Sequence, residues 1–264
     1  MTERVVGLLG RTPAIHPVGY RLIDSYVDAL PQSPPVFDHT GGFDGFRMLG
    51  NGPDPTLHVH DGRPVGDCAF VGTQAVTICD QIETGEPLTW ASSDELVSTY
   101  LAYNRGRDIG ANLSQLLAYW HTVGLPWAGK CAGYAALNFR DLDGFWAGVN
   151  AFGNGYLGIV VTAAMQAQTQ AGEPWDLTGS PLERQVMGGH CVVAIARTSE
   201  EGDGEVATWG MRQPFTAKWF RANVEEAHVV LTPSQVARKG NGYGLTLPEL
   251  QSDLSAVNSQ ALAA

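Results

Sequence analysis

The stretch Val-Gly-Asp-Cys-Ala-Phe at residues 65–70 opens the longest helical pattern of the chain. Apolar residues recur at helical spacing over 69–84, and Gly85 ends the run. Asp67 is the predicted N-cap, so Cys68 is expected in the first turn, where the helix dipole favours a thiolate. The local pattern leaves two interpretations of Cys68, a nucleophile or a small buried core residue.

His190 is the second candidate for chemistry. It follows two glycines and precedes the continuous apolar run 191–196, which predicts a buried strand. A second strand is predicted at 205–209, after a turn at 199–204. An imidazole at the start of such a hairpin projects from the sheet, and beside Cys68 it becomes a candidate general base.

The order of these motifs resembles the papain-like cysteine peptidase superfamily. The residues that carry the resemblance are 66–70, the Gly-Gly-His at 188–190 and the Ala-Thr-Trp-Gly at 207–210. The resemblance implies that the thiol lies on a helical half, that the histidine lies on a sheet, and that Trp209 shields the histidine. With residues 213–216 and 225–231, it extends to uncharacterised papain-fold proteins of tailed bacteriophages and prophages, particularly those of actinobacteria.

Two departures from the peptidase pattern stand out. Ala207 takes the place of the asparagine that orients the imidazole, and Thr208 and Gln213 are the possible substitutes. We predict Thr208 as the third catalytic residue, although a strand turns it to the opposite face from Ala207. The segment 58–64 also lacks the glutamine that the resemblance implies as an oxyanion donor. Its histidines, His58 and His60, are expected in an exposed loop.

A missing donor weakens such a site without abolishing it. The backbone N–H of Cys68 is still expected to hold the oxyanion, and the loss of one donor typically costs about 3 kcal/mol of transition-state stabilisation. His60 and Arg63 are alternative donors, but both are more simply interpreted as solvated loop residues. The sequence therefore favours a Cys68/His190 dyad over a complete triad.

Composition narrows the classes of partner. A formal net charge of −11 argues against nucleic acid and against an anionic membrane surface. The start of the chain has no signal-peptide pattern, and no apolar run reaches transmembrane length. The expected partners are a protein or peptide substrate or neighbouring virion proteins, with a homo-oligomer possible. The expected location is the virion or the host cytoplasm.

The four cysteines predict neither a disulfide scaffold nor a metal site. Cys68 and Cys79 would be roughly 16 Å apart along one helix, which is beyond bridging distance. Cys131 and Cys191 are expected as buried thiols. Because the chain has no Cys-x-x-Cys and no His-Glu-x-x-His, we expect no metal and no cofactor.

The prolines divide the chain. Residues 1–60 contain seven of them and one predicted short helix at 20–30, which is typical of an arm and not of a core. Three roles for the arm remain open: a propeptide in the cleft, a permanently packed segment, or a contact with a neighbouring subunit. Residues 61–264 are predicted to form a papain-like domain.

The predicted elements place helices early and strands late. Helices are expected at 93–103, 113–123, 142–152, 216–226 and 246–254, and strands at 156–162, 189–197, 205–209 and 228–232. This order predicts an α+β fold with a helical half packed against a mainly antiparallel sheet. The tryptophans at 120, 127, 146, 209 and 219 are expected mostly in the core.

Two functions from different classes follow. In the first, the protein is a phage-encoded thiol hydrolase, with Cys68 as nucleophile and His190 as base. In the second, it is an inactive papain-fold structural or accessory protein of a phage head or tail. Ala207 and the missing glutamine favour the second function, whereas the presence of both Cys68 and His190 favours the first.

Overall fold

A computed structural model describes residues 10–11, 32–50 and 57–237. The predicted helices at 20–30 and 246–254 lie outside the described residues. The helices are α2 (Cys68–Thr84), α3 (Ser93–Tyr103), α4 (Leu113–Thr122), α5 (Leu142–Phe152), α6 (Ala163–Ala171), α7 (Ala217–Asn223) and α8 (Pro233–Ala237), with 3-10 turns η1 (Gly45–Leu49) and η2 (Pro181–Arg184).

A seven-stranded sheet forms the centre of the molecule, and its strands pair antiparallel. Its main order is β4-β9-β5-β6-β7-β8, and β1 also pairs with β6. The strands are β1 (Phe37–Asp38), β4 (Gly133–Ala136), β5 (Gly155–Thr162), β6 (Val186–Arg197), β7 (Gly204–Thr208), β8 (Met211–Phe215) and β9 (Val224–Leu231). A separate small hairpin joins β2 (Val59–His60) to β3 (Arg63–Pro64).

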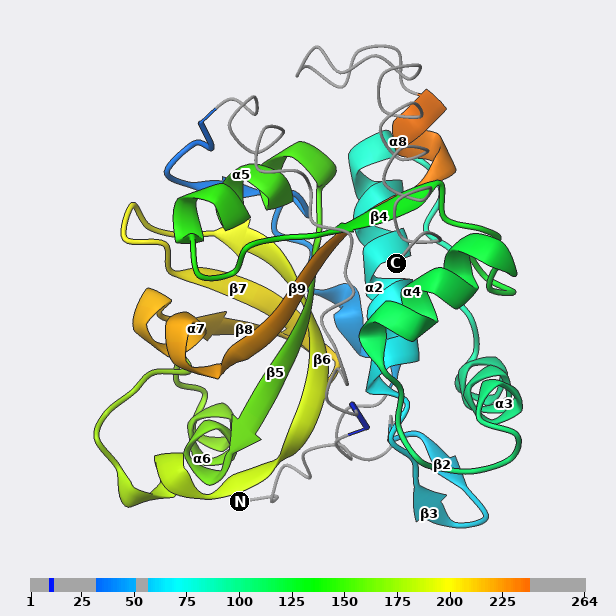
Figure 1. The fold of residues 1–264 in the computed structure, drawn as a ribbon, viewed down its shortest axis with the longest axis horizontal. Helices are drawn as coiled ribbons and strands as arrows, with labels where there is room; N and C mark the ends of the chain where they lie inside the picture. The colour runs from blue at the N-terminus through cyan, green and yellow to red at the C-terminus, as the bar shows by residue number, and fades with distance from the viewer. Residues whose placement is uncertain (1–9, 12–31, 51–56, 238–264) are drawn as a thin grey trace, which may run out of the picture.

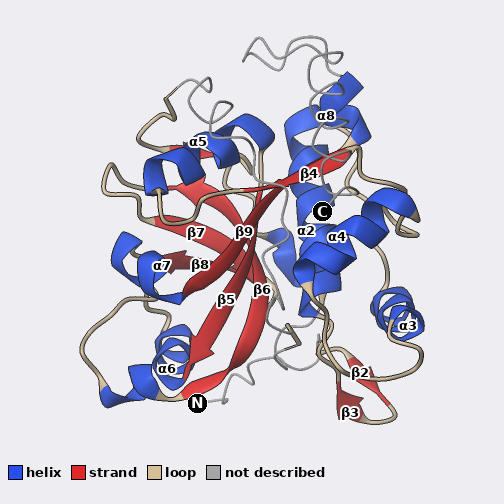
Figure 2. Cartoon of the chain, viewed as in Figure 1, coloured by secondary structure: helices blue, strands red, loops and turns tan. Residues whose placement is uncertain are grey.

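Both faces of the sheet are covered. Helices α2, α3 and α4 gather on one side, and α5, α6 and α7 lie on the other (Figures 1 and 2). Alternate residues of β6 enter different cores: Cys191 and Val193 pack with α2, whereas Val192 and Ala194 pack with α5. This explains the continuous apolar run, because a strand buried on both faces needs no polar alternation. The predicted α+β arrangement is confirmed.

The predicted helix caps are confirmed at three helices. Ser92 accepts a hydrogen bond from the Glu95 N–H at the start of α3, and Asn112 accepts one from the Gln115 N–H at the start of α4. Gly85 ends α2 in the left-handed conformation, with φ of 69°. These boundaries depend on local chemistry, which the sequence carries directly.

In the C-terminal half, one predicted element is wrong and one strand was missed. The helix expected over 216–226 ends at Asn223, because Val224 is extended and pairs with Ile159 as the first residue of β9. Strand β8, which contains Pro214, was not among the predicted strands. Proline is tolerated there because β8 is the last strand of the main path, at the edge of the sheet.

Helix α2 packs very closely on the sheet. The Tyr156 hydroxyl on β5 donates a 2.7 Å hydrogen bond to the Ala69 carbonyl in the first turn of α2. At Gly72, one turn further on, an added Cβ would lie 2.8 Å from the Tyr156 ring and 2.9 Å from Cys191 Sγ. A glycine at this position therefore sets the distance between the helix and the strands.

Gly72→Ala is expected to lower the free energy of unfolding by roughly 1–2 kcal/mol, because overpacking a core outweighs the gain in helix propensity. The measurement is urea unfolding followed by circular dichroism. Helix propensity alone predicts the opposite sign, a gain of up to about 1 kcal/mol. A more stable variant would therefore contradict the close packing described here.

Candidate active site

Cys68 is the first residue of α2 and is buried. Asp67 occupies the N-cap position, as predicted, but its side chain does not cap the helix. Instead, Asp67 Oδ2 lies 2.6 Å from His58 Nδ1. The residue before Asp67 has its own contact: the Gly66 N–H donates a 3.1 Å hydrogen bond to Asp108 Oδ1.

The expectation that His58 lies in an exposed loop is wrong. Its side chain and that of Asp67 are both fully buried, whereas His60 is half exposed, as expected. Burial raises the pKa of Asp67, and the hydrogen bond and charge of His58 offset part of this effect. The pair ties the segment before the nucleophile to the helix start. No local pattern predicts this pair, because the two residues are nine positions apart, on either side of the β2–β3 hairpin.

His190 lies on β6 and is held by two residues of the β7–β8 hairpin. Its Nε2 is 2.7 Å from Thr208 Oγ1, and its ring stacks on Trp209 with centroids 4.7 Å apart and planes 16° apart. Trp209 and Gly210 have φ of 45° and 72° and form the two-residue turn between Thr208 and Met211. The hairpin turn therefore packs the indole against the imidazole.

Strand register explains why Thr208, and not Ala207, contacts the histidine. Ala207 pairs with Val193, so it shares the face of Val193 and Cys191. The next residue, Thr208, turns to the other face, which is that of Val192 and His190. The alternation that set Thr208 apart from Ala207 is thus the feature that brings its hydroxyl to the imidazole.

The other candidate orienter, Gln213, lies elsewhere. Its amide donates to the carbonyls of Glu173 and Pro214, at 2.9 and 3.0 Å. His190 Nδ1 is buried and has no hydrogen-bond partner among the described residues. With Nε2–H donating to the Thr208 hydroxyl, Nδ1 carries a lone pair and is the nitrogen that can accept a proton.

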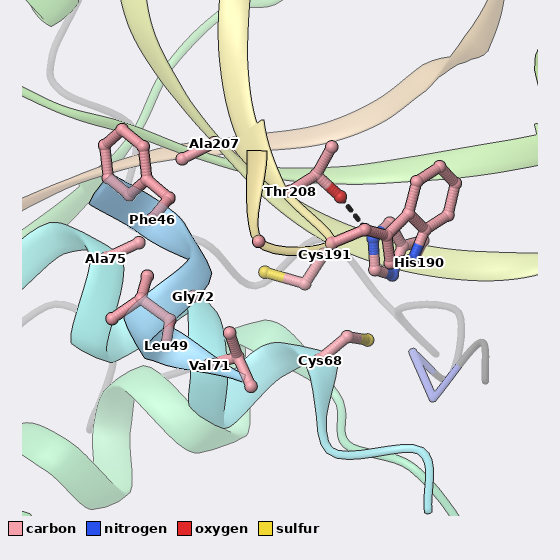
Figure 3. Close-up of a pocket in the computed structure, with 12 residues that line it drawn as sticks. Phe46, Leu49, Cys68, Val71, Gly72, Ala75, His190, Cys191, Ala207 and Thr208 are labelled. Carbon is pink, nitrogen blue, oxygen red and sulfur yellow. Dashed lines mark hydrogen bonds between the residues drawn. The ribbon is translucent and has the colours of Figure 1, made fainter. Parts of the chain in front are cut away.

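One small cavity joins these groups. Figure 3 shows Cys68 on α2 and His190 on β6 across it, with the hydrogen bond from His190 to Thr208. The cavity has a volume of about 20 Å³, enough for roughly one water molecule. Its lining is otherwise mainly apolar: Phe46, Leu49, Val71, Gly72, Ala75, Cys191, Ala207, Trp209 and Gly210.

Burial keeps both members of the dyad neutral in this structure. It raises the pKa of Cys68 to about 11, although backbone hydrogen bonds from Cys191 and Gly10 lower it in part. Burial also lowers the pKa of His190 to about 3. At neutral pH the pair is therefore a thiol and a neutral imidazole, and not an ion pair.

Residues 10–11 lie directly over the thiol and cross between the two halves of the fold. The Arg11 N–H donates to the Gly189 carbonyl at 3.1 Å, next to His190, and the Ala111 N–H donates to the Gly10 carbonyl at 2.7 Å. Cys68 and His190 are each 2% exposed. Sequence reasoning did not single out Gly10 or Arg11, since nothing in a two-residue pattern reveals a partner a hundred or more residues away.

This architecture, with a cysteine heading a helix and a histidine on the facing sheet, defines the papain-like cysteine protease fold. The structure of xylellain, a cysteine protease from Xylella fastidiosa, matches with a TM-score of 0.62 and 15% identity, over 88% of this chain and 98% of that one.

Two further matches have lower scores. Procathepsin L 3 of Tenebrio molitor gives a TM-score of 0.45 and 12% identity, over 79% of this chain and 86% of that one. A structure from a study of the mite allergens Blo t 1 and Der p 1 gives 0.48 and 13%, over 80% and 74%. Since both scores are below 0.5, the fold assignment depends on xylellain. No protein-family model and no curated sequence matches the chain.

Within residues 10–11, 32–50 and 57–237, no group of three or more His, Cys, Asp or Glu side chains is placed to hold a metal ion. Every helix in these ranges is too short or too polar to span a bilayer. All four cysteines are free and buried.

Alkylation of Cys68 by iodoacetamide is expected to be slow at pH 7.5, roughly a hundredfold slower than that of an ordinary thiol, because a pKa of about 11 leaves little thiolate. The rate should still rise with pH above 9. Peptide mass spectrometry of the native protein measures it. A rate that levels off below pH 8 would contradict the neutral pair.

His190 should make the fold sensitive to acid. Because its pKa is about 3 in the folded protein and about 6.5 when unfolded, its stabilising contribution is complete above pH 6.5 and is lost as pH falls toward 3. Between pH 7 and 5 we expect wild type to lose about 2 kcal/mol more unfolding free energy than His190→Gln. Urea unfolding at both pH values measures this loss.

The matched control is His60→Gln, because His60 is half exposed. This variant should retain the wild-type loss of stability between pH 7 and 5. If His190→Gln retained it as well, the burial of a neutral His190 would be contradicted.

Proposed function

We propose that the protein is a cysteine-dependent peptide hydrolase with Cys68 as nucleophile, His190 as general base and Thr208 as a positioning residue. The observation that carries this proposal is the difference between the two ring nitrogens of His190. Its Nε2 lies 2.7 Å from Thr208 Oγ1, its Nδ1 has no hydrogen-bond partner among the described residues, and His190 and Cys68 line the same cavity.

The reaction follows from these positions. The Cys68 thiol gives its proton to His190 Nδ1, and Sγ forms a bond to the carbonyl carbon of the substrate. The carbonyl π electrons move to oxygen, which the backbone N–H of Cys68 stabilises. When the tetrahedral adduct collapses, the C–N bond breaks and His190 returns the proton to the leaving amine. The product is a thioester on Cys68.

Water completes the cycle. His190 takes a proton from water, the resulting hydroxide attacks the thioester carbon, and the C–S bond breaks. The carboxyl product leaves, and the proton on His190 returns to the Cys68 sulfur. Thr208 accepts the Nε2–H throughout and so leaves Nδ1 free to take and return the proton.

The closed site supports a second candidate, an inactive papain-fold protein. The specific observations are the 2% exposure of Cys68 and the neutral state of the dyad. The motif resemblance to papain-fold phage proteins supports a further proposal, that the chain is made with a tailed phage and is built into the virion. Its partners would then be neighbouring virion proteins. Mass spectrometry of purified particles tests this, and absence of the chain would overturn it.

The hydrolase proposal is tested by the rate of cleavage of a quenched-fluorescent peptide library. Cys68→Ala should abolish turnover, and His190→Ala should lower kcat/KM by at least a hundredfold, the typical contribution of a general base. Folding of each variant is checked by circular dichroism. If folded wild type cleaves no peptide at any pH from 5 to 10, the inactive alternative stands.

Thr208→Val removes the hydroxyl at nearly constant volume. We expect kcat to fall about fivefold to tenfold with little change in KM, which corresponds to the loss of one hydrogen bond of about 1 kcal/mol. Thr208→Ser keeps the hydroxyl and should recover most of the activity. Equal activity in Thr208→Val and Thr208→Ser would contradict a positioning role.

A further inference from the structure

The short segment Gly10–Arg11 is bound as an extended peptide at the nucleophile. Arg11 makes β-bridges with Gly189 on the sheet side and with Ala111 on the helical side. The hydrogen bonds described above involve only main-chain groups of Gly10 and Arg11. Such bonds are independent of side chains, so another extended peptide can make them at the same place.

Glycines make room for this backbone. An added Cβ would lie 2.7 Å from Gly10 Cα at Gly66, 2.0 Å from the Gly10 oxygen at Gly110, and 2.8 Å from the Arg11 oxygen at Gly189. On the bound side, a Cβ on Gly10 itself would lie 1.6 Å from the Gly66 oxygen. The groove therefore fits a glycine at the position of Gly10, since any larger residue would collide with its wall.

The Arg11 side chain enters an acidic pocket. Its Nη1 lies 2.8 Å from Glu225 Oε2 and its Nη2 lies 3.5 Å from Glu226 Oε2, and the side chain is 2% exposed. At Gly158, the strand beneath leaves space for it, because a Cβ there would be 2.5 Å from Arg11 Nε. A guanidinium reaches two carboxylates at once with its planar fork, which a lysine ammonium cannot reproduce.

The deeper carboxylate is fixed before any ligand arrives. Glu226 Oε1 accepts from the Ser114 hydroxyl and lies beside His228 Nε2, both at 2.9 Å, which leaves Oε2 directed at Arg11. Glu226 is almost fully buried, whereas Glu225 is about half exposed at the pocket mouth. Two carboxylates around one buried position need a cation, because unpaired charge is costly there.

We propose that this groove and acidic pocket form the substrate-recognition site for peptides containing Gly-Arg, and that the chain's own Gly10 and Arg11 occupy it in this structure. The inference rests on the proposed hydrolase function, whose substrate class it names. Glu225 and Glu226 select the guanidinium, and Gly66, Gly110 and Gly189 admit the backbone beside Cys68.

The test is binding of a fluorescein-labelled hexapeptide with the sequence of residues 8–13, and of the same peptide with citrulline in place of arginine. Citrulline keeps the shape but removes the charge. Binding is measured by fluorescence anisotropy to the full-length Cys68→Ala protein, with and without Arg11→Ala. Cys68→Ala prevents turnover, and Arg11→Ala removes the internal competitor.

The arginine peptide is expected to bind the Arg11→Ala protein at least tenfold more tightly than the citrulline peptide does. It should also bind at least tenfold more tightly there than to the protein that retains Arg11, because the tethered segment competes. Equal affinity for the two peptides, or no binding to a folded Arg11→Ala protein, would overturn the proposal.

A second variant covers the case in which Arg11→Ala does not fold. Glu225→Gln, in the chain with Cys68 intact, keeps the pocket shape but weakens the hold on Arg11. We expect iodoacetamide to label Cys68 at least threefold faster at pH 8.5, since the covering segment is released more often. The control is Glu201→Gln in the exposed turn. Equal rates in the two variants would overturn the proposal.

Turnover separates this inference from the proposed function. If the arginine peptide binds selectively but neither wild type nor Arg11→Ala, both with Cys68 intact, cleaves any peptide, the recognition site stands and the hydrolase function falls. If wild type cleaves the arginine and citrulline peptides equally, the hydrolase function stands and the recognition site falls.

Discussion

The close approach of helix α2 to strands β5 and β6 is the constraint on which the site depends. Gly72 allows it, and the Tyr156 hydroxyl holds the first turn of the helix at 2.7 Å. This contact fixes the height of Cys68 over the sheet, and the register of β6 with β7 places His190 beside Thr208. A larger residue at Gly72 would push α2 away from the sheet and so move Cys68 away from His190. The packing of the core therefore sets the geometry of the site.

Burial decides the electrostatics that follow. Thiol–imidazole pairs work as nucleophiles when the charged form is stabilised, yet here desolvation opposes charge on both partners. The segment Gly10–Arg11 lies against the thiol, and the backbone hydrogen bond from Gly10 lowers the pKa of Cys68 in part, so burial outweighs this contact.

The cost of burying a charge also explains the composition of the acidic pocket. A buried guanidinium requires carboxylates, and a buried carboxylate requires donors, so Arg11, Glu226, Ser114 and His228 form one connected network. The network joins the helical half, the sheet and the N-terminal segment. Glu225, which also pairs with Arg11, is about half exposed at the edge of this network.

The sequence by itself determined the local features. Capping residues predict where helices start and end. The candidate nucleophile Cys68 was identified by its place at a helix start, and the candidate base His190 by two glycines that precede an apolar strand. Tertiary structure decided the rest. It brought Thr208 and not Ala207 to the imidazole, buried His58 against Asp67, ended α7 early by pairing Val224 with Ile159, and placed Arg11 beside Glu226. These contacts join residues distant in the chain or depend on strand register, whereas capping and periodicity act within a few residues.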